Sequence, residues 1–382
     1  MSAILGTYAR RPVSFSHGKG CYLYSTKNEK YLDFVSGIAV NALGHCHDHL
    51  VKAVKTQAEK LWHVSNAFEI PEQEKLAQRL VDHTFADYVI FMNSGAEATE
   101  ASIKIARKYF YEKGQPEKNR IITFKGAFHG RTLASLFAAN NPEHTKGFEP
   151  KVEGFDQVDF GDHDALKKSI NKNTAAIMVE TILGEGGIKI IPNQCLQGLR
   201  KLCDEHDLLL ILDEVQCGIG RSGKFFAFEW SGIEPDIVPI AKGIGGGFPV
   251  GACLVNKKAG SGMKPGNHGS TFGGNPLAMS VGNAVLDIIL EKGFLDQVVK
   301  QGQYFENELL KLKEKFPSVI EEVRGKGLLR GVKLKVENTQ FLNELFEHKM
   351  LAVKASENVV RLLPPLIVTE NEIDEGISII EK

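Results

Sequence analysis

Residues 208–248, LLLILDEVQCGIGRSGKFFAFEWSGIEPDIVPIAKGIGGGF, decide the fold of this chain. Two short apolar runs in it, 208–212 and 236–241, predict buried strands bounded by polar and glycine-rich punctuation. The first run ends at Asp213 and the second at Lys242. Open α/β sheets bind ligands at the carboxyl ends of their strands. The sequence therefore predicts a carboxylate and an amine at a ligand-binding edge of a sheet.

Lys242 is followed by a glycine-rich segment, which leaves room for a bulky group beside its amine. Burial disfavours a charged amine, so the pKa of Lys242 should be lowered. A neutral lysine attacks carbonyl groups and forms a Schiff base, notably with pyridoxal phosphate (PLP). That chemistry needs an acid facing the ring nitrogen, and Asp213 is the candidate. From this pair alone, a simple ion pair that ends two strands is an equally good interpretation.

Length and composition describe an ordinary globular protein. The 382 residues suffice for a large domain and a smaller one, and the apolar content is 43%. The formal net charge of −1 favours neither a nucleic-acid nor a membrane-surface partner. No apolar run approaches the roughly 18 residues of a membrane span, and we expect no signal peptide. The six cysteines have no framework spacing, which is typical of reduced thiols in a cytoplasmic protein.

The segment 93–97, Asn-Ser-Gly-Ala-Glu, lies between an apolar run at 88–92 and a long helical pattern. Ser94 and Glu97 fit a capping box, which is a purely structural interpretation. A strand, a turn of small residues and a helix N-terminus also make an anion site. The backbone N–H groups of Gly95 and Ala96 are therefore candidates for holding a phosphate.

Closely spaced histidine and cysteine at 45–49, His-Cys-His-Asp-His, raise the question of a metal site. The spacing is too tight for one tetrahedral ion. Asp48 also fits the N-cap of a helix that continues through Leu61. We therefore predict a loop and a helix start here, and no metal.

Several motifs in the same order resemble the class III aminotransferases, the ornithine and acetylornithine type. They are LDEVQ at 212–216, a strand ending at Ala241-Lys242, GGGFP at 245–249 and STFGGNP at 270–276. The resemblance runs over nearly the whole chain. It implies a fold-type-I PLP enzyme of α/β class, with a mostly parallel seven-stranded sheet flanked by helices.

The resemblance assigns roles to particular residues. It implies that Lys242 bonds to PLP and acts as acid and base, and that Asp213 holds the ring nitrogen protonated. Further residues implied to bind the cofactor are Ser94, Gly95, Ala96, Phe128, His129, Glu180, Val215, Gln216 and Thr271. Those implied to bind the substrate are Ile38, Arg131, Glu185, Ser270 and Arg361. The chain departs from the family at Thr181, where a proline is usual, and at Leu183, where a glutamine is usual.

Alternating strands and helices near both ends predict a second, smaller α/β domain. We expect residues 1–47 and 276–382 to form it and residues 48–275 to form the large domain. Residues 22–24 and 31–34 are expected to pair as a hairpin around a polar turn.

The resemblance implies transamination of N-acetylornithine with 2-oxoglutarate, a step of arginine biosynthesis, by a cytoplasmic homodimer with shared active sites. The apolar Ile38 favours an acylated donor, because ornithine-specific relatives have a tyrosine there that meets the free amine. Other ω-amino donors, namely ornithine, succinylornithine or 4-aminobutyrate, stay open. The GxGxxG pattern at 218–223 raises a nucleotide-binding dehydrogenase as a remote alternative. No long helix pattern or later acidic residue supports that alternative.

Overall fold

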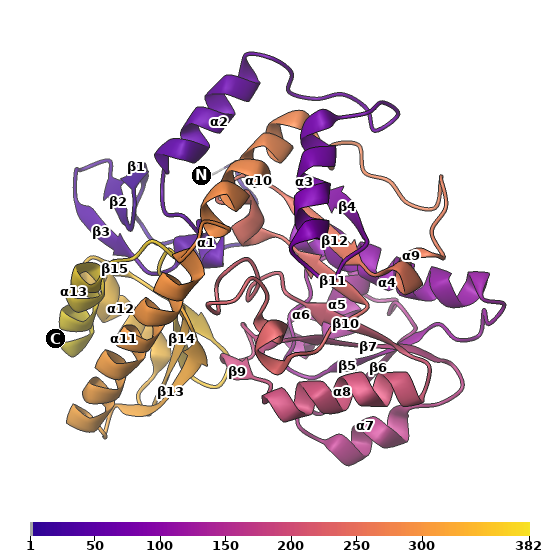
Figure 1. Ribbon diagram of the computed structural model, residues 1–382. Helices are drawn as coiled ribbons and strands as arrows, with labels where there is room; N and C mark the ends of the chain where they lie inside the picture. The colour runs from indigo at the N-terminus through magenta and orange to yellow at the C-terminus, as the bar shows by residue number, and fades with distance from the viewer. Residues whose placement is uncertain (1–2) are drawn as a thin grey trace.

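The computed structural model describes residues 3–382 and is built around a seven-stranded sheet (Figure 1). In sheet order its strands are β4 (Tyr88–Met92), β12 (Gly251–Val255), β11 (Ile237–Ile240), β10 (Leu209–Asp213), β7 (Thr174–Glu180), β5 (Arg120–Phe124) and β6 (Phe155–Val158). Only β12 runs antiparallel to its neighbours. The expected fold class, with a mostly parallel seven-stranded sheet, is confirmed.

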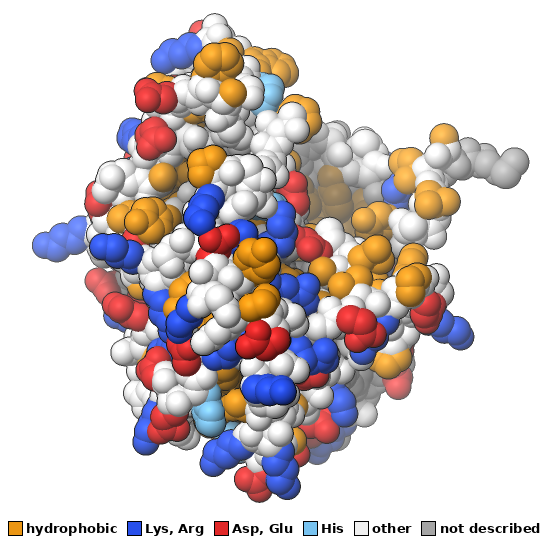
Figure 2. Space-filling model, turned by 90° about the vertical axis from the view of Figure 1, so that its right-hand side faces the viewer, with side chains coloured by type: hydrophobic (Ala, Val, Ile, Leu, Met, Phe, Trp, Pro, Cys, Tyr) orange, Lys and Arg blue, Asp and Glu red, His pale blue; other side chains and the backbone are white. Residues whose placement is uncertain are grey.

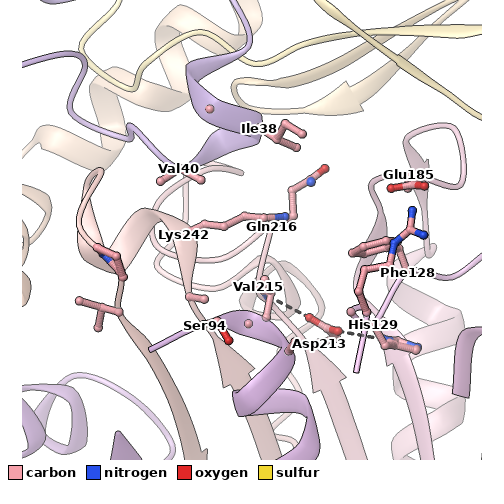
Figure 3. A pocket seen from close by; sticks show the side chains of 18 of the residues that line it. Ile38, Val40, Ser94, Phe128, His129, Glu185, Asp213, Val215, Gln216 and Lys242 are labelled. Carbon is pink, nitrogen blue, oxygen red and sulfur yellow. Dashed lines mark hydrogen bonds and ion pairs between the residues drawn. The ribbon is translucent and has the colours of Figure 1, made fainter. Parts of the chain in front are cut away.

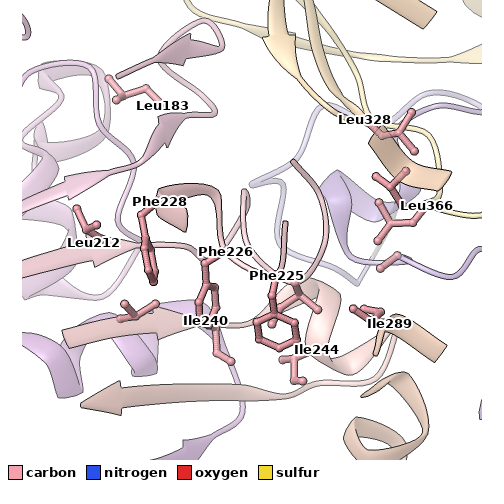
Figure 4. Close-up of a cluster of buried hydrophobic side chains, with 14 of the residues drawn as sticks. Leu183, Leu212, Phe225, Phe226, Phe228, Ile240, Ile244, Ile289, Leu328 and Leu366 are labelled. Atoms are coloured by element: carbon pink, nitrogen blue, oxygen red, sulfur yellow. The ribbon is translucent and has the colours of Figure 1, made fainter. Parts of the chain in front are cut away.

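Helices cover both faces of this sheet, which explains why its strands are continuous apolar runs. In β10, Leu209 and Ile211 join the hydrophobic cluster that includes α4 (Gly95–Glu112). Leu210 and Leu212 point to the other face and join the cluster that includes α8 (Asn193–Glu205). Figure 4 shows part of that second cluster, where Leu212 and Ile240 of neighbouring strands lie close to phenylalanines of the 225–228 segment. The two-residue period of a strand thus divides one apolar run between two cores.

Further helices complete the layers. Those packed on the sheet or on each other are α2 (Asp48–Ala58), α3 (Pro71–Asp82), α5 (Leu133–Ala139), α6 (Pro142–Thr145), α7 (His163–Ser169), α9 (Lys257–Gly260) and α10 (Pro276–Ile289). Short elements near the sheet edge are β8 (Ile182–Leu183), β9 (Lys189–Ile190) and the 3₁₀ turns η1 (Ala227–Ser231) and η2 (Lys242–Gly245).

Both ends of the chain contribute to the smaller part of the molecule. One sheet, in the order β1 (Phe15–Lys19), β2 (Tyr22–Ser25), β3 (Lys30–Asp33) and β15 (Met350–Leu351), joins the N-terminal hairpin to a C-terminal strand. A second sheet has the order β13 (Ile320–Lys326), β14 (Leu329–Leu334), β17 (Val359–Leu362) and β16 (Val353–Ala355). Helices α11 (Phe294–Lys315), α12 (Asn338–Glu347) and α13 (Glu370–Glu381) accompany them. The hairpin is confirmed, while the domain boundaries stay a prediction.

The helix start near residue 48 differs in detail from the expectation. His47 occupies the N-cap, Asp48 is the first helical residue, and the helix ends at Ala58 before reaching Leu61. The Asp48 carboxylate pairs with the ammonium of Lys19 and therefore does not cap the helix. Nε2 of His45 is hydrogen-bonded to Oδ2 of Asp33 at 2.7 Å, which ties this loop to β3.

The surface carries charges of both signs. Figure 2 shows basic and acidic side chains interspersed over one face, which fits the near-zero net charge. No helix in residues 3–382 combines the length and apolar character that a bilayer span requires.

Candidate active site

A cavity of about 510 Å³ lies at the carboxyl ends of the parallel strands (Figure 3). Its walls come from segments that follow β4, β5, β7, β10 and β11, and from residues 37–40 and Arg361 of the smaller part. Residues far apart in the sequence are thus brought to the sheet edge where the fold predicts a ligand site.

Most of the residues implied by the resemblance line this one cavity. They are Ile38, Ser94, Gly95, Ala96, Phe128, His129, Arg131, Glu180, Glu185, Asp213, Val215, Gln216, Lys242 and Arg361. Two do not: Ser270 lines a separate cavity, and Thr271 is exposed on the loop beside it. The individual roles stay a prediction, to which the structure adds the position of each side chain.

Lys242 begins the turn η2 directly after β11, and its backbone has a φ of 47°. A non-glycine residue in this left-handed region is strained, and such strain concentrates at functional sites. Burial and, after it, the neighbouring charge of Arg361 together lower the pKa of the Lys242 amine to about 8, against the opposing charge of Asp213. The amine therefore carries a larger neutral fraction at physiological pH than an exposed lysine does.

Asp213 ends β10 with both carboxylate oxygens engaged. Oδ1 accepts from the backbone N–H of Val215 at 3.0 Å, and Oδ2 lies 2.8 Å from Nδ1 of His129. Burial alone would lower the pKa of His129, but the hydrogen bond and charge of Asp213 outweigh it, so the pKa is raised. His129 Nε2 is buried without a hydrogen-bond partner among the described residues. These contacts fix the orientation of the Asp213 carboxylate at the cavity.

Glu180 ends β7 next to this pair. Its carboxylate accepts the backbone N–H of Phe128 at 2.9 Å and that of Gly184 at 3.2 Å. Burial and the charge of Asp213 raise the pKa of Glu180, although His129 opposes them. Glu180 thus holds two cavity loops in place through their backbones.

The first turn of α4 confirms the helix cap at Ser94 and has a geometry that suits the predicted anion site. The Ser94 hydroxyl accepts from the N–H of Glu97 at 3.3 Å, as a helix cap does. The N–H groups of Gly95 and Ala96 come before the first carbonyl partners of the helix, so they remain available to an anion. A Cβ at Gly95 would lie 2.7 Å from Val215 Cγ1, so only glycine fits there.

Arg361 reaches the cavity from β17. Its Nη1 donates to Gln216 Oε1 at 3.3 Å and its Nη2 to the Lys354 carbonyl at 3.0 Å. In residues 3–382 no ion pair within 4 Å joins it to Glu185, whose Oε1 lies 3.9 Å from Nε2 of His144. Burial lowers the pKa of Arg361 while the charge of Glu185 opposes this at longer range. The Glu185 carboxylate therefore does not cap the Arg361 guanidinium in this structure.

Ile38 sits on an unusual turn, residues 36–39 (α1, Ser36–Ala39), whose φ values are 49°, 65°, 66° and 63°. A left-handed turn costs roughly 1–2 kcal/mol per non-glycine residue. Asp33 Oδ1 accepts two N–H groups at the start of the turn, and the Ser36 hydroxyl donates to the Leu363 carbonyl at 2.8 Å. These bonds hold the strained backbone, and the apolar Ile38 side chain faces the cavity (Figure 3).

Some cavity residues were given no individual role from the sequence. They are Gly37, Val40, Asn93, Gly130, Ala241, Gly247, Phe248, Pro249 and Val250. Two features of the sequence could have indicated them: the GGGFP motif, and their position next to residues already assigned to the site. The sequence marked Thr181 only as a departure from the family and did not show that its hydroxyl donates to the buried Glu214 carboxylate at 2.6 Å. Thr181 occupies the position where the family usually has proline, so the departure supplies a hydrogen bond.

The cavity fits PLP by its chemistry. A lysine amine with a lowered pKa, an oriented carboxylate and a helix N-terminus face one space. They match in turn an aldehyde, a pyridine nitrogen and a phosphate. The 218–223 segment leads into the turn η1 and not into a helix, which removes the dehydrogenase interpretation.

The fold and cavity define an α/β transferase of the PLP-dependent type. The family model described as aminotransferase class-III matches residues 7–382. An acetylornithine aminotransferase from Agrobacterium fabrum is 58% identical over 99% of this chain and 95% of its own length. The chain therefore belongs to the class III aminotransferase family, and its cofactor is PLP.

Solved structures agree with this assignment. An ornithine aminotransferase from Toxoplasma gondii matches with a TM-score of 0.95 at 31% identity, over 99% of this chain and 91% of its own. An N-acetylornithine aminotransferase from Stenotrophomonas maltophilia matches with a TM-score of 0.86 at 35% identity, over 98% and 96%. Structural likeness alone thus does not separate ornithine from acetylornithine as donor.

Proposed function

We propose that this aminotransferase converts N-acetylornithine and 2-oxoglutarate into N-acetylglutamate semialdehyde and glutamate, a step of arginine biosynthesis. The observation that carries the choice of donor is Ile38, an apolar side chain at the cavity. It offers no partner to the α-ammonium of ornithine, and an unpaired buried charge is costly. A neutral acetamide meets no such penalty. Relatives that are up to 58% identical and named acetylornithine aminotransferase support the same choice.

Lys242 carries the proton transfers, and Asp213 supports them. Bound PLP makes the substrate carbon acidic by delocalising the electrons left behind. The Lys242 amine takes the proton from that carbon and later returns one, as base and then acid. The Asp213 carboxylate, held by Val215 and His129, places negative charge where a protonated ring nitrogen needs it. Val215 and Phe128 line the space for the ring.

Two arginines divide the substrate carboxylates. Each partner substrate has a distal carboxylate, for which Arg131 supplies a planar guanidinium. Only glutamate and 2-oxoglutarate have a second carboxylate at the reacting carbon, for which Arg361 is placed. With the acetylated donor bound, Gln216 remains the hydrogen-bond partner of Arg361. A swing of Glu185 towards Arg361 in that state stays a hypothesis, which fails if Glu185→Ala leaves both half-reaction rates unchanged.

The donor assignment is tested by kcat/KM for N-acetylornithine and ornithine on one preparation, with 2-oxoglutarate as acceptor. Because a buried unpaired ammonium costs at least about 2 kcal/mol, the acetylated donor should be favoured by roughly thirtyfold or more. Succinylornithine and 4-aminobutyrate belong in the same panel. Equal or better use of ornithine contradicts the proposal. If kcat/KM is highest for another donor in the panel, that donor is the substrate in place of N-acetylornithine.

We also propose a cytoplasmic homodimer with shared sites. Ser270 and Thr271 lie outside the cavity of their own chain, which leaves the exposed Thr271 hydroxyl able to reach a neighbouring chain's cofactor phosphate. Such a donor supplements the partial positive charge of the α4 N-terminus. Mixing inactive Lys242→Ala and Thr271→Ala chains should restore one site in each heterodimer. A fully active monomer in sedimentation contradicts shared sites.

A further inference from the structure

His144, on the one-turn helix α6, contacts two charged residues of the substrate pocket. Its Nε2 lies 3.1 Å from Nη2 of Arg131 and 3.9 Å from Oε1 of Glu185. Its ring also meets that of Phe128 edge-on, with centroids 6.4 Å apart. Among the described residues, His144 is the one polar partner of the Arg131 guanidinium. No motif in the sequence singles out His144, which lies half-buried on α6.

We propose that His144 is the positioning residue for the distal-carboxylate clamp: it orients Arg131 and so sets the preference for substrates with a distal carboxylate. The inference rests on the proposed role of Arg131. Arg131 starts from an exposed loop position and has a long, flexible side chain, so orientation must be imposed by contacts. The guanidinium lies over the Phe128 ring, with Cζ 5.5 Å from the ring centroid, and this cation–π contact restricts its position. The His144 bond then fixes its rotation.

The protonation of His144 in this contact follows from its partner. A guanidinium has donors only, so His144 Nε2 must accept and its proton must lie on Nδ1. One Nη2 hydrogen of Arg131 is used, and the remaining four N–H donors can still take a carboxylate in the two-bond geometry. His144 therefore orients the clamp without blocking it.

Glu185 competes for the same nitrogen. Donation from Nε2 to Glu185 requires a proton on Nε2, and that proton excludes the bond from Arg131. The two contacts are alternatives, and the 3.1 Å distance shows the Arg131 contact as the closer one. Glu185 therefore takes no hydrogen bond from Nε2 of His144, and in residues 3–382 it forms no ion pair with Arg361, which leaves Arg361 open to the second carboxylate of an acceptor.

The rigidity of α6 makes His144 a usable anchor. The Asn141 side chain caps the turn by accepting the N–H of Glu143 at 3.0 Å. The Thr145 hydroxyl donates to the Asn141 carbonyl at 3.1 Å, and Thr145 itself is buried. The position of the imidazole is thus set by the turn and not by the substrate.

The test compares two acceptors of equal length, 2-oxoglutarate and 2-oxopentanoate, in which a methyl group replaces the distal carboxylate. The holoenzyme is first converted to its pyridoxamine form, so only the acceptor half-reaction is measured and the identity of the donor does not matter. His144→Phe keeps the ring packed on Phe128 but removes the acceptor. His144→Gln places an amide oxygen near the Nε2 position. Glu143→Gln, on the same turn and exposed, is the matched control.

We expect His144→Phe to lower the ratio of kcat/KM for 2-oxoglutarate over 2-oxopentanoate by about tenfold, the usual effect of one hydrogen bond to a charged group. The loss should fall on the acceptor concentration that gives half the maximal rate, with the maximal rate of the half-reaction changed less than about twofold, because the clamp acts in binding. His144→Gln should restore the ratio to within about threefold, and Glu143→Gln should not change it.

Two results would overturn the inference. One is an unchanged ratio in His144→Phe, whether both acceptors keep their rates or both fall equally, and the other is a His144→Gln variant no better than His144→Phe. An equal fall identifies a structural role, since a misfolded loop harms both acceptors alike. Failure of the proposed function looks different: the unaltered protein would then show no preference for 2-oxoglutarate, or none for N-acetylornithine as donor.

Discussion

The pKa of the Lys242 amine should control how fast the protein takes up PLP. Burial and the charge of Arg361 lower that pKa from 10.5 to about 8. At pH 7 about one amine in ten is then neutral, compared with about three in ten thousand at the ordinary value. Because only the neutral amine attacks an aldehyde, PLP attachment near neutral pH should be roughly 300-fold faster than an exposed lysine would allow.

Two substitutions should move this pKa in opposite directions. Arg361 carries a like charge, which disfavours the ammonium, so Arg361→Gln should raise the pKa of Lys242. Asp213 carries the opposite charge, so Asp213→Asn should lower it. The rate at pH 7 falls about tenfold for each unit by which the pKa rises above pH 8, since the neutral fraction falls in that proportion. At a pH well above the pKa of Lys242 the amine is neutral in every variant, so the substitutions no longer change the rate through charge.

The assay mixes PLP-free protein with PLP between pH 6 and pH 10.5 and follows the rate of covalent attachment by absorbance. The pH at which the rate reaches half its maximum reports the pKa of Lys242. PLP itself also titrates, but it does so equally for all variants and does not affect their comparison. The unaltered protein should have its midpoint near pH 8. An unchanged or lowered midpoint in Arg361→Gln refutes the electrostatic reasoning. So does a shift of both variants in the same direction.

Three further substitutions test other parts of the site. Gly95→Ala places a Cβ 2.7 Å from Val215 Cγ1 and should weaken PLP binding by about tenfold or more at the α4 N-terminus, in an equilibrium titration. Thr181→Val removes the 2.6 Å donor from Glu214 and should lower the free energy of unfolding by about 1–3 kcal/mol in urea. Lys242→Ala should release PLP on dialysis and show almost no turnover in a coupled assay.

Matched controls separate these effects from general disturbance. Gly198→Ala, in a helix where a Cβ meets nothing within 4 Å, should leave PLP affinity unchanged. Thr26→Val, at an exposed position, should leave stability within about 0.5 kcal/mol. Normal PLP affinity in Gly95→Ala, full stability in Thr181→Val, or normal turnover in Lys242→Ala contradicts the respective prediction.

The regular part of the fold was predictable because local pattern and tertiary environment agree there. The strand expected at 208–212 is observed at Leu209–Asp213, and the hairpin around residues 25–30 forms as expected. The start of α2 was misplaced by one residue, since the side chain of Asp48 pairs with Lys19 and leaves the cap to His47. Boundaries of this kind depend on a single contact, which the local pattern does not contain.

By itself the sequence determined the chemistry at the strand ends, because a strand that stops places its next residue at the edge of the sheet. Asp213 and Lys242 follow from that rule alone. Only the tertiary structure decided which distant groups meet them: the bond from His129 to Asp213, the approach of Arg361 from β17, and the contact of His144 with Arg131. Such contacts join residues from separate elements, and their geometry is set by packing, which no local spacing encodes.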